Sequence, residues 1–456
     1  MRALAVLAAV LIALGIPCAA RAGGFEVPDQ SPSAAATGGA SAARTDDPSA
    51  AWYDPAALCD GRGLRASFAI TFAIPTITAT SLDDPALGAP ISTATSVTTP
   101  LALNVSWASP DDPYAFGLYA GIPFGSGVQW PSDWWGRFDA LSSSIRIFRV
   151  APFFAYRFRE LRNFTFAVGP HVDAGSFELA RALDFVDTQG SLRALFTGAS
   201  AGGHAALYVE PIEELALALT YKSRTVMPMS GSADFSDVPD AFSGRAQDQP
   251  ARTELVLPDR FVLGGALRLD AFRAYLDLGL SLWSVRDAVR IDFQNDATPD
   301  VVQPAQWRET LDLHAGAEYA IVPEVTARAG LRYEMAAAPA STLAPSSPDL
   351  DRFGLAFGAA VDPIPELGFD VAYAYTALLG GASTSQDAVP GSYGGDVHLI
   401  SLAVRVHVDP RPAPQTDSAA DPEPEPEAPG APADPAGAAP GADDTDPQSD
   451  LPSGER

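Results

Sequence analysis

Residues able to do chemistry are few and scattered in this sequence. The five histidines lack the short spacings of a metal site: His171, His204, His314, His398 and His407. The sequence has no H-E-x-x-H zinc motif. A serine–histidine pair that is distant in sequence is the remaining enzymatic alternative, and no residues single one out. We therefore expect no metal, no cofactor and no enzymatic activity.

Aromatic and basic residues gather around one stretch that could hold an apolar ligand. Three tryptophans occur within six residues of what we interpret as a loop, where their rings could capture a ligand. Two arginines could meet a ligand carboxylate. The candidates for ligand capture are Phe124, Trp130, Trp134, Trp135, Arg137 and Arg157. The alternatives are packing of the rings within the loop or at a membrane interface, and pairing of both arginines with acids of the protein itself.

The first 22 residues have the pattern of a secretory signal peptide. Arg2 precedes an apolar run, 3–16, that is too short to span a bilayer, and 20–22 forms an A-x-A cleavage site. We predict that 1–22 is removed; an uncleaved anchor helix is the alternative. Cleavage would leave Cys59 as the only cysteine, which excludes a disulfide framework. The net charge of −27 argues against nucleic acid as a partner.

The segments after the signal alternate between apolar and polar positions, as strands between lipid and water do. One apolar series comprises Ile400, Leu402, Val404, Val406 and Val408. The residues between them are Ser401, Ala403, Arg405 and His407. Similar runs recur at 276–282, 311–319 and 325–333. Each run has about the ~9–11 residues that a tilted strand needs to cross a bilayer.

The connections between these segments separate a membrane barrel from a soluble β-sandwich, which also alternates. Short turns such as 322–324 occur at one end, and longer polar stretches such as 235–250 and 336–349 occur at the other. An open strand edge in lipid would leave peptide groups unpaired, so the sheet must close. We predict an all-β, 14-stranded antiparallel transmembrane β-barrel over 61–408. Because the strand number is even, we expect both termini on the periplasmic side.

Two segments do not follow the strand pattern. Residues 23–60 are rich in Ala, Ser, Gly and Asp, and irregular backbone survives at membrane depth only inside protein or a watery lumen. This segment therefore lies in the periplasm or plugs the barrel. Residues 409–456 form a Pro- and Ala-rich tail that we predict to be disordered, with eleven acids against two arginines over 411–456. The tail is either a solvated spacer or a periplasmic tether to a basic partner.

Several stretches, in their order and spacing, resemble the FadL/TodX family of outer-membrane transporters for long-chain fatty acids and aromatic hydrocarbons. The resemblance covers most of 24–408. The stretches that carry it include 38–40, 42–49, 54–58, 123–125, 134–137, 155–157, 257–260, 316–319 and 348–352. The family usually has Asn-Pro-Ala where this chain has Asp54-Pro55-Ala56, a change that adds a possible charge.

The resemblance implies a monomeric barrel with an N-terminal hatch in its lumen. The hatch residues it implies are Gly38, Gly39, Asp46, Asp47, Asp54, Pro55 and Ala56. It also implies passive uptake of hydrophobic compounds, which leave sideways into lipid through a kinked third strand. In this chain that strand is predicted at 113–121, where Gly117 and Gly121 would permit a bend.

Two other functions remain open at this point. One is a barrel without transport activity that anchors the acidic tail to an envelope partner. The other is an ordinary hydrophilic porin. The partners we expect are a long-chain fatty acid or another hydrophobic small molecule, and outer-membrane lipid.

Overall fold

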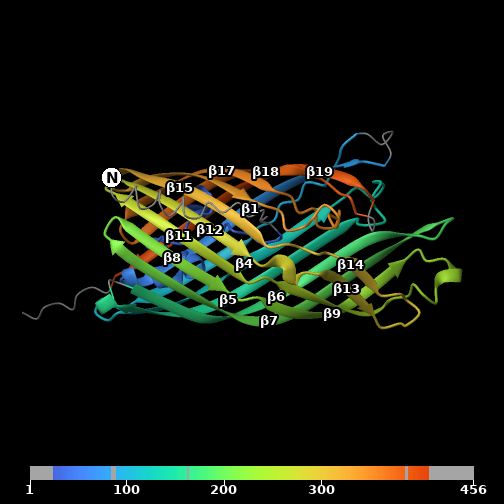
Figure 1. Cartoon of the computed structure of the whole chain (residues 1–456), viewed down its shortest axis with the longest axis horizontal. Coiled ribbons are helices and arrows are strands. Elements are labelled where there is room, and N and C mark those ends of the chain that lie inside the picture. Colours follow the sequence, from blue (N-terminus) through green and yellow to red (C-terminus); the bar gives the residue numbers. More distant parts are fainter. Residues whose placement is uncertain (1–23, 84–88, 162–163, 386–388, 410–456) are drawn as a thin grey trace, which may run out of the picture. The chain divides into compact units, whose positions relative to one another are not determined.

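Long antiparallel strands close into a barrel in the part of the chain that the structure describes (Figure 1). This computed structural model describes residues 24–83, 89–161, 164–385 and 389–409. The predicted signal peptide and the predicted tail after Asp409 lie outside these residues. Closure comes from pairing of β1 (Gly63–Ser81) with β19 (Gly391–Val408), whose registers run from Leu64 opposite Val408 to Ser81 opposite Gly391.

Fourteen strands cross the wall, and five of them are interrupted, which gives 19 numbered segments. Besides β1 and β19, the continuous strands are β4 (Tyr114–Gln129), β5 (Ser142–Phe158), β6 (Phe164–Asp184), β7 (Gln189–Ile212), β16 (Val325–Glu334), β17 (Arg352–Ile364) and β18 (Leu367–Ala382). The interrupted strands are β2 (Ile91–Ser92) with β3 (Leu101–Ala108), β8 (Leu215–Lys222) with β9 (Thr225–Ser236), β10 (Gln249–Leu257) with β11 (Arg260–Leu269), β12 (Phe272–Ser281) with β13 (Ala288–Phe293), and β14 (Val301–Pro304) with β15 (Thr310–Val322). The predicted fold class is confirmed.

The alternation along the strands separates an apolar outer face from a polar lumen. In β19, Ile400 and Val404 are 42% and 40% exposed, whereas Ser401 between them is fully buried. Because successive side chains of a strand point to opposite faces, the exposed series faces outward. The band of exposed Leu, Val, Ile and Phe side chains around the barrel is the surface expected in contact with lipid.

The two ends of the barrel differ in their connections. At one end β17 and β18 are joined by residues 365–366, and β15 and β16 by 323–324. The first residue of β1 and the last of β19 lie at this end, which we call the turn end. At the opposite end, which we call the loop end, the connections include 130–141 and 335–351.

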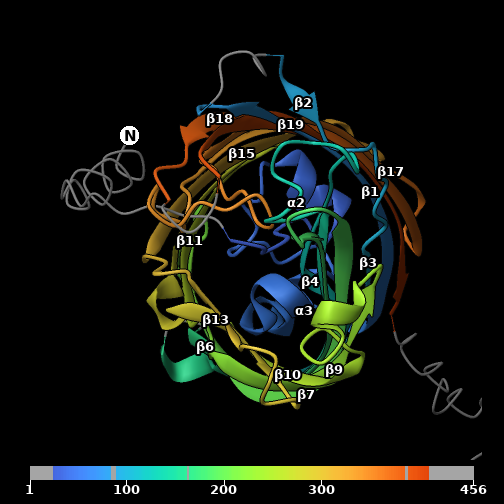
Figure 2. The same ribbon diagram turned by 90° about the vertical axis from the view of Figure 1, so that its right-hand side faces the viewer.

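The segment before β1 folds inside the barrel as the hatch, residues 24–60 (Figure 2). It contains α2 (Pro32–Ala36), α3 (Ala50–Tyr53) and the 3₁₀ helix η1 (Pro55–Asp60). Further 3₁₀ turns are η3 (Arg159–Leu161), η4 (Asp240–Phe242) and η5 (Trp283–Val285). Among the described residues, no helix combines the length and the apolar character needed to cross a membrane.

Ion pairs and close backbone contacts hold the hatch against the wall. The Arg44 guanidinium donates to Glu318 of β15 at 2.5 Å. Asp277 of β12 accepts hydrogen bonds from the backbone N–H groups of Ser41 and Ala42, at 2.7 and 2.9 Å. A carboxylate that accepts two backbone N–H groups makes a strong contact. The hatch is therefore fixed to several strands.

The third wall strand is longer than predicted. β4 runs from Tyr114 to Gln129, whereas the sequence predicts that this strand ends at Gly121. The continuation is rich in glycine and does not alternate cleanly, so periodicity misses it. Its backbone nevertheless pairs with β5 as far as Gln129 opposite Ser142. Phe124 consequently belongs to the wall and not to the following loop.

Candidate functional site

A cavity of about 370 Å³ lies inside the barrel between the start of the hatch and the wall. Its apolar lining comprises Val27, Pro28, Ile77, Ile122, Ile145, Leu378, Val397 and Leu399. Two arginines in the lining are paired with acids: Arg332 with Asp29 at 2.7 Å, and Arg352 with Glu334 at 3.6 Å. A cavity of this size with apolar walls and a few fixed polar groups suits a small hydrophobic ligand.

The wall beside this cavity is open along one edge of β4. Pairing between β3 and β4 stops at Ala102 opposite Gly121. The register of β4 against β5 shifts between Gly121 and Phe124, which marks a bulge. Contact between the two neighbouring wall segments resumes where the N–H of Ala94 donates to the carbonyl of Gln129, at 2.8 Å.

We call the interval between these two contacts the wall window; its edges are residues 95–101 and 122–128. The cavity lining includes 98–100 and 125–127, one stretch from each edge. It also includes Arg146, an exposed residue that alternates with buried neighbours on β5 and therefore lies on the outer face. The cavity thus extends from the lumen through the wall window to the outer surface.

The free edge of β4 in the window pairs with the first residues of the hatch. The N–H of Val27 donates to the carbonyl of Pro123, and the N–H of Gly125 donates to the carbonyl of Phe25, both at 2.8 Å. Residues 24–29, which we call the N-terminal strap, therefore act as a short added strand. They satisfy backbone groups that would be costly if left unpaired at membrane depth.

The N-terminal strap is tied to the opposite wall by ion pairs. Glu26 contacts Arg260 of β11 at 3.1 Å, and Asp29 contacts Arg332 of β16 at 2.7 Å. Arg260 also makes a bidentate pair with Asp312 of β15, at 2.8 and 3.0 Å. The strap lines the cavity, so any movement of the strap changes the shape of the cavity.

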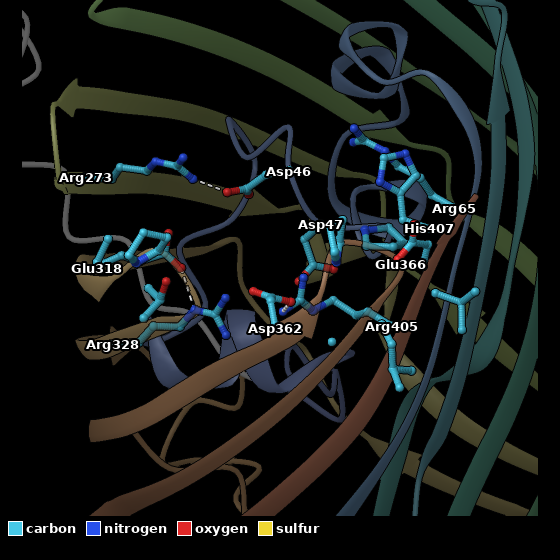
Figure 3. A pocket seen from close by; sticks show the side chains of 18 of the residues that line it. Asp46, Asp47, Arg65, Arg273, Glu318, Arg328, Asp362, Glu366, Arg405 and His407 are labelled. Carbon is cyan, nitrogen blue, oxygen red and sulfur yellow. Dashed lines mark hydrogen bonds and ion pairs between the residues drawn. The ribbon is translucent and has the colours of Figure 1, made fainter. Parts of the chain in front are cut away.

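A second pocket, of about 410 Å³, opens at the turn end and is charged (Figure 3). Its labelled residues are Asp46, Asp47, Arg65, Arg273, Glu318, Arg328, Asp362, Glu366, Arg405 and His407. The pairs include Arg328 with Glu318 at 2.6 Å and Arg405 with Asp362 at 2.9 Å. An apolar ligand here would strip water from charged groups without replacing its hydrogen bonds. This pocket therefore does not suit an apolar ligand.

Two of the predicted hatch residues, Gly38 and Gly39, form a tight turn against the wall. Their φ angles are 67° and 97°, in the left-handed region that side chains rarely adopt. A Cβ on Gly38 would lie 2.5 Å from the carbonyl oxygen of Leu331, and one on Gly39 would lie 2.6 Å from the His314 ring. Both positions thus require glycine for conformation and for space.

The predicted hatch acids have different surroundings. Asp46 and Asp47 line the charged pocket, where the guanidinium groups of Arg44 and Arg273 hold the pKa of Asp46 below its ordinary value. Asp54 is fully buried and caps η1, because its Oδ1 accepts a hydrogen bond from the N–H of Ala56 at 2.9 Å. Pro55 occupies the first turn of η1, where its lack of a backbone N–H costs no helical hydrogen bond.

The predicted capture aromatics form a packed cluster at the loop end. Trp130 and Trp134 stack with ring centroids 4.3 Å apart and are 4% and 1% exposed. The indole N–H of Trp130 donates to the carbonyl of Pro345 at 3.0 Å. Trp135 is half-buried beside them, and Phe124 is buried in the wall. Trp130 and Trp134 thus present little free ring surface to a ligand.

The two predicted arginines lie at opposite ends of the barrel. Arg137 precedes β5 at the loop end, where its guanidinium lies over the Phe138 ring and donates to Gln189 at 3.2 Å. Arg157 is near the end of β5 at the turn end and pairs with Asp60 of the hatch. The structure therefore does not bring Arg157 together with the aromatic cluster.

Sequence reasoning missed the N-terminal strap, which lines the cavity. Phe25 packs edge-on against Trp283 with centroids 5.0 Å apart, and Trp307 packs against both rings. Phe25 is the first aromatic residue after the predicted cleavage site, and this position was the available signal. The wall window depends on unequal strand lengths, for which periodicity gives no signal.

Among the described residues, no group of three or more His, Cys, Asp or Glu side chains is placed to hold a metal ion.

Sequence and fold comparisons connect the chain to known proteins. Residues 14–407 match the sequence profile of a family described as outer membrane protein transport protein (OMPP1/FadL/TodX). No curated protein matches the chain in sequence.

Solved structures share the fold at low sequence identity. A Pseudomonas aeruginosa FadL homologue aligns with a TM-score of 0.75 at 19% identity, over 84% of this chain and 99% of that one. The toluene transporter TodX of P. putida aligns with a TM-score of 0.67 at 16% identity, over 83% of this chain and 99% of that one. The toluene transporter TbuX of Ralstonia pickettii aligns with a TM-score of 0.61 at 18% identity, over 84% of this chain and 100% of that one.

Proposed function

The chain belongs to the OMPP1/FadL/TodX family of outer-membrane transport proteins, and from that premise we propose that it mediates passive uptake of hydrophobic small molecules. Long-chain fatty acids and aromatic hydrocarbons are the ligand classes in view. Two structurally similar proteins are described as toluene transporters, which supports an apolar ligand.

The observation that carries the proposal is the cavity that continues through the wall window. A hydrophobic ligand in the lumen has two ways out, through the charged pocket at the turn end or sideways through the window. The sideways route avoids the charged pocket at the turn end and delivers the ligand to lipid, where each buried CH₂ contributes about 0.8 kcal/mol. Lateral exit is therefore the route we propose.

This route also fits one orientation of the barrel. We propose that the loop end faces the outside and the turn end the periplasm, because outer-membrane barrels have long outer loops and short periplasmic turns. The ligand then enters between the long loops, reaches the cavity above the hatch and leaves through the window.

Uptake of a radiolabelled fatty acid and of labelled toluene tests the proposal in whole cells. A strain that makes the protein should accumulate at least one of these ligands faster than an otherwise identical strain that lacks it. Heat-modifiable mobility on gels would show that equal amounts of folded barrel are present. Equal rates in the two strains for both ligands would contradict the proposed function.

A further inference from the structure

Arg146 stands at the outer mouth of the wall window with no recorded partner. It lies on the exposed face of β5, opposite Gly125 of β4 and Ser176 of β6. Among the described residues, the structure records no hydrogen bond, ion pair or ring contact of its side chain. The two other arginines that line the cavity, Arg332 and Arg352, are both paired with acids.

The outer face of β4 beside Arg146 is a furrow without side chains. Beyond the bulge, the outward positions are Gly125 and Gly127. A Cβ on Gly125 would find its nearest neighbour at 3.7 Å, and one on Gly127 would find only the carbonyl of Ser143, at 3.8 Å. A flexible hydrocarbon chain could therefore lie over this backbone and contact the cavity on one side and lipid on the other.

Arg146 also marks the upper edge of the apolar band on β5. The outward residues below it are apolar or aromatic: Phe148, Val150, Pro152, Phe154, Tyr156 and Phe158. The next outward residue above it, Ser144, is polar. The ten residue-to-residue steps from Phe148 to Phe158 rise by about 25 Å along a strand tilted by ~40°, which is the height of the apolar band in such barrels. The guanidinium therefore lies at the level of lipid head groups.

We propose that Arg146 binds the carboxylate of an amphipathic ligand at the outer mouth of the wall window. This inference rests on the proposed function and on lateral exit. A planar guanidinium forms two parallel hydrogen bonds to a carboxylate, so it holds the head group at the interface. The hydrocarbon tail then passes over the glycine furrow into lipid. For a neutral ligand the same residue offers no comparable contact, so Arg146 is a specificity-determining residue.

The test compares two ligands of equal chain length, hexadecanoic acid and hexadecan-1-ol, both radiolabelled. Initial uptake is measured at about pH 8, where a carboxyl group is ionised. The variants are R146Q, which removes the charge, and R146K, which retains it. R290Q is the matched control, since Arg290 is an exposed outward arginine on β13, in a wall strand that contacts neither β4 nor β5.

We expect R146Q to lower the uptake of the acid about tenfold, as loss of a charge-assisted contact would, with uptake of the alcohol unchanged. R146K should restore part of the acid uptake, and R290Q should behave as wild type. Equal loss of both ligands, or no loss of either, would overturn the assignment and leave the proposed function standing. Wild-type cells that take up neither these two ligands nor labelled toluene faster than cells lacking the protein would refute the proposed function itself.

A membrane lipid is the competing occupant of this site. If phosphate-bearing lipid copurifies with wild type but not with R146Q, while acid uptake is equal in both, Arg146 holds a lipid of the membrane. That result would also overturn the proposal. Mass spectrometry of purified protein in the same detergent provides this measurement.

Discussion

Asp54 is a buried aspartate at a position where the resemblance predicts asparagine, and it caps a helix of the hatch. The family usually has asparagine at this position, and an aspartate there could carry a negative charge. Burial raises the pKa of the Asp54 carboxyl well above its ordinary value, so the neutral acid is favoured. A neutral carboxyl has the same shape as an amide and still offers an oxygen to the N–H of Ala56.

Substitutions at Asp54 should therefore separate shape from charge. D54N keeps the capping oxygen and should leave the hatch as stable as in wild type or more so. D54A removes the cap and should destabilise the hatch by about 1 kcal/mol. Hydrogen exchange of peptides that cover 50–60 measures both effects. Equal loss of protection in D54N and D54A would show that the ionised carboxylate is required.

The pH dependence of hatch protection gives a second readout of the same residue. The pKa of Asp54 is raised in the folded state, so the folded hatch binds its proton more tightly than the unfolded chain does. This stabilisation is complete below the unfolded pKa of about 3.9 and is lost as the pH rises through the folded pKa. After correction for intrinsic exchange, the difference between wild type and D54N should grow as the pH rises. A difference that stays constant with pH would contradict the assignment.

At the scale of elements, small residues allow the hatch to approach the wall. A Cβ on Gly330 of β16 would lie 2.1 Å from the backbone carbonyl carbon of Thr37, so the hatch backbone would have to move. We expect G330A to speed hydrogen exchange of hatch residues 31–40 while the barrel stays folded. G265A is the matched control, because the nearest atom to its Cβ would be 3.8 Å away. Unchanged exchange in G330A would show that this contact does not hold the hatch.

The wall strands could be predicted from the sequence because their environment imposes a period of two. Lipid on one side and a polar lumen on the other make the 400–408 run alternate, and the fold class followed from such runs. The end of β4 could not be predicted in this way. Beyond Gly121 its side chains are small and one edge meets the N-terminal strap. The two faces of the strand therefore no longer differ in polarity, and the sequence does not alternate.

The candidate site could be predicted only in outline. The hatch motifs placed residues 38–56 inside a barrel through a resemblance, and the structure has them there. The loop tryptophans were proposed as capture residues, yet Trp130 and Trp134 are buried against each other and the loops. The cavity arises where the strap, β4 and distant strands meet, and such long-range contacts leave no local signature.

At the scale of the whole molecule, a barrel filled by its own first residues should conduct few ions. The hatch packs against several strands, and the pocket at the turn end is lined by paired charges. We expect the intact protein to be nearly silent in a planar lipid bilayer. Deletion of residues 24–60 should give a steady current if the barrel still inserts. A large steady conductance of the intact protein would favour a hydrophilic porin.

The central claim is that ligands leave through the wall window, and uptake by a window-blocked variant tests it most directly. The double substitution G125L/G127L places two bulky side chains on the outer face of β4, where an added Cβ would meet no atom closer than 3.7 Å. The barrel should fold and remain closed to ions. We predict that this variant takes up labelled hexadecanoic acid several-fold more slowly than wild type at equal amounts of folded protein. Uptake at the wild-type rate would contradict lateral exit through the window.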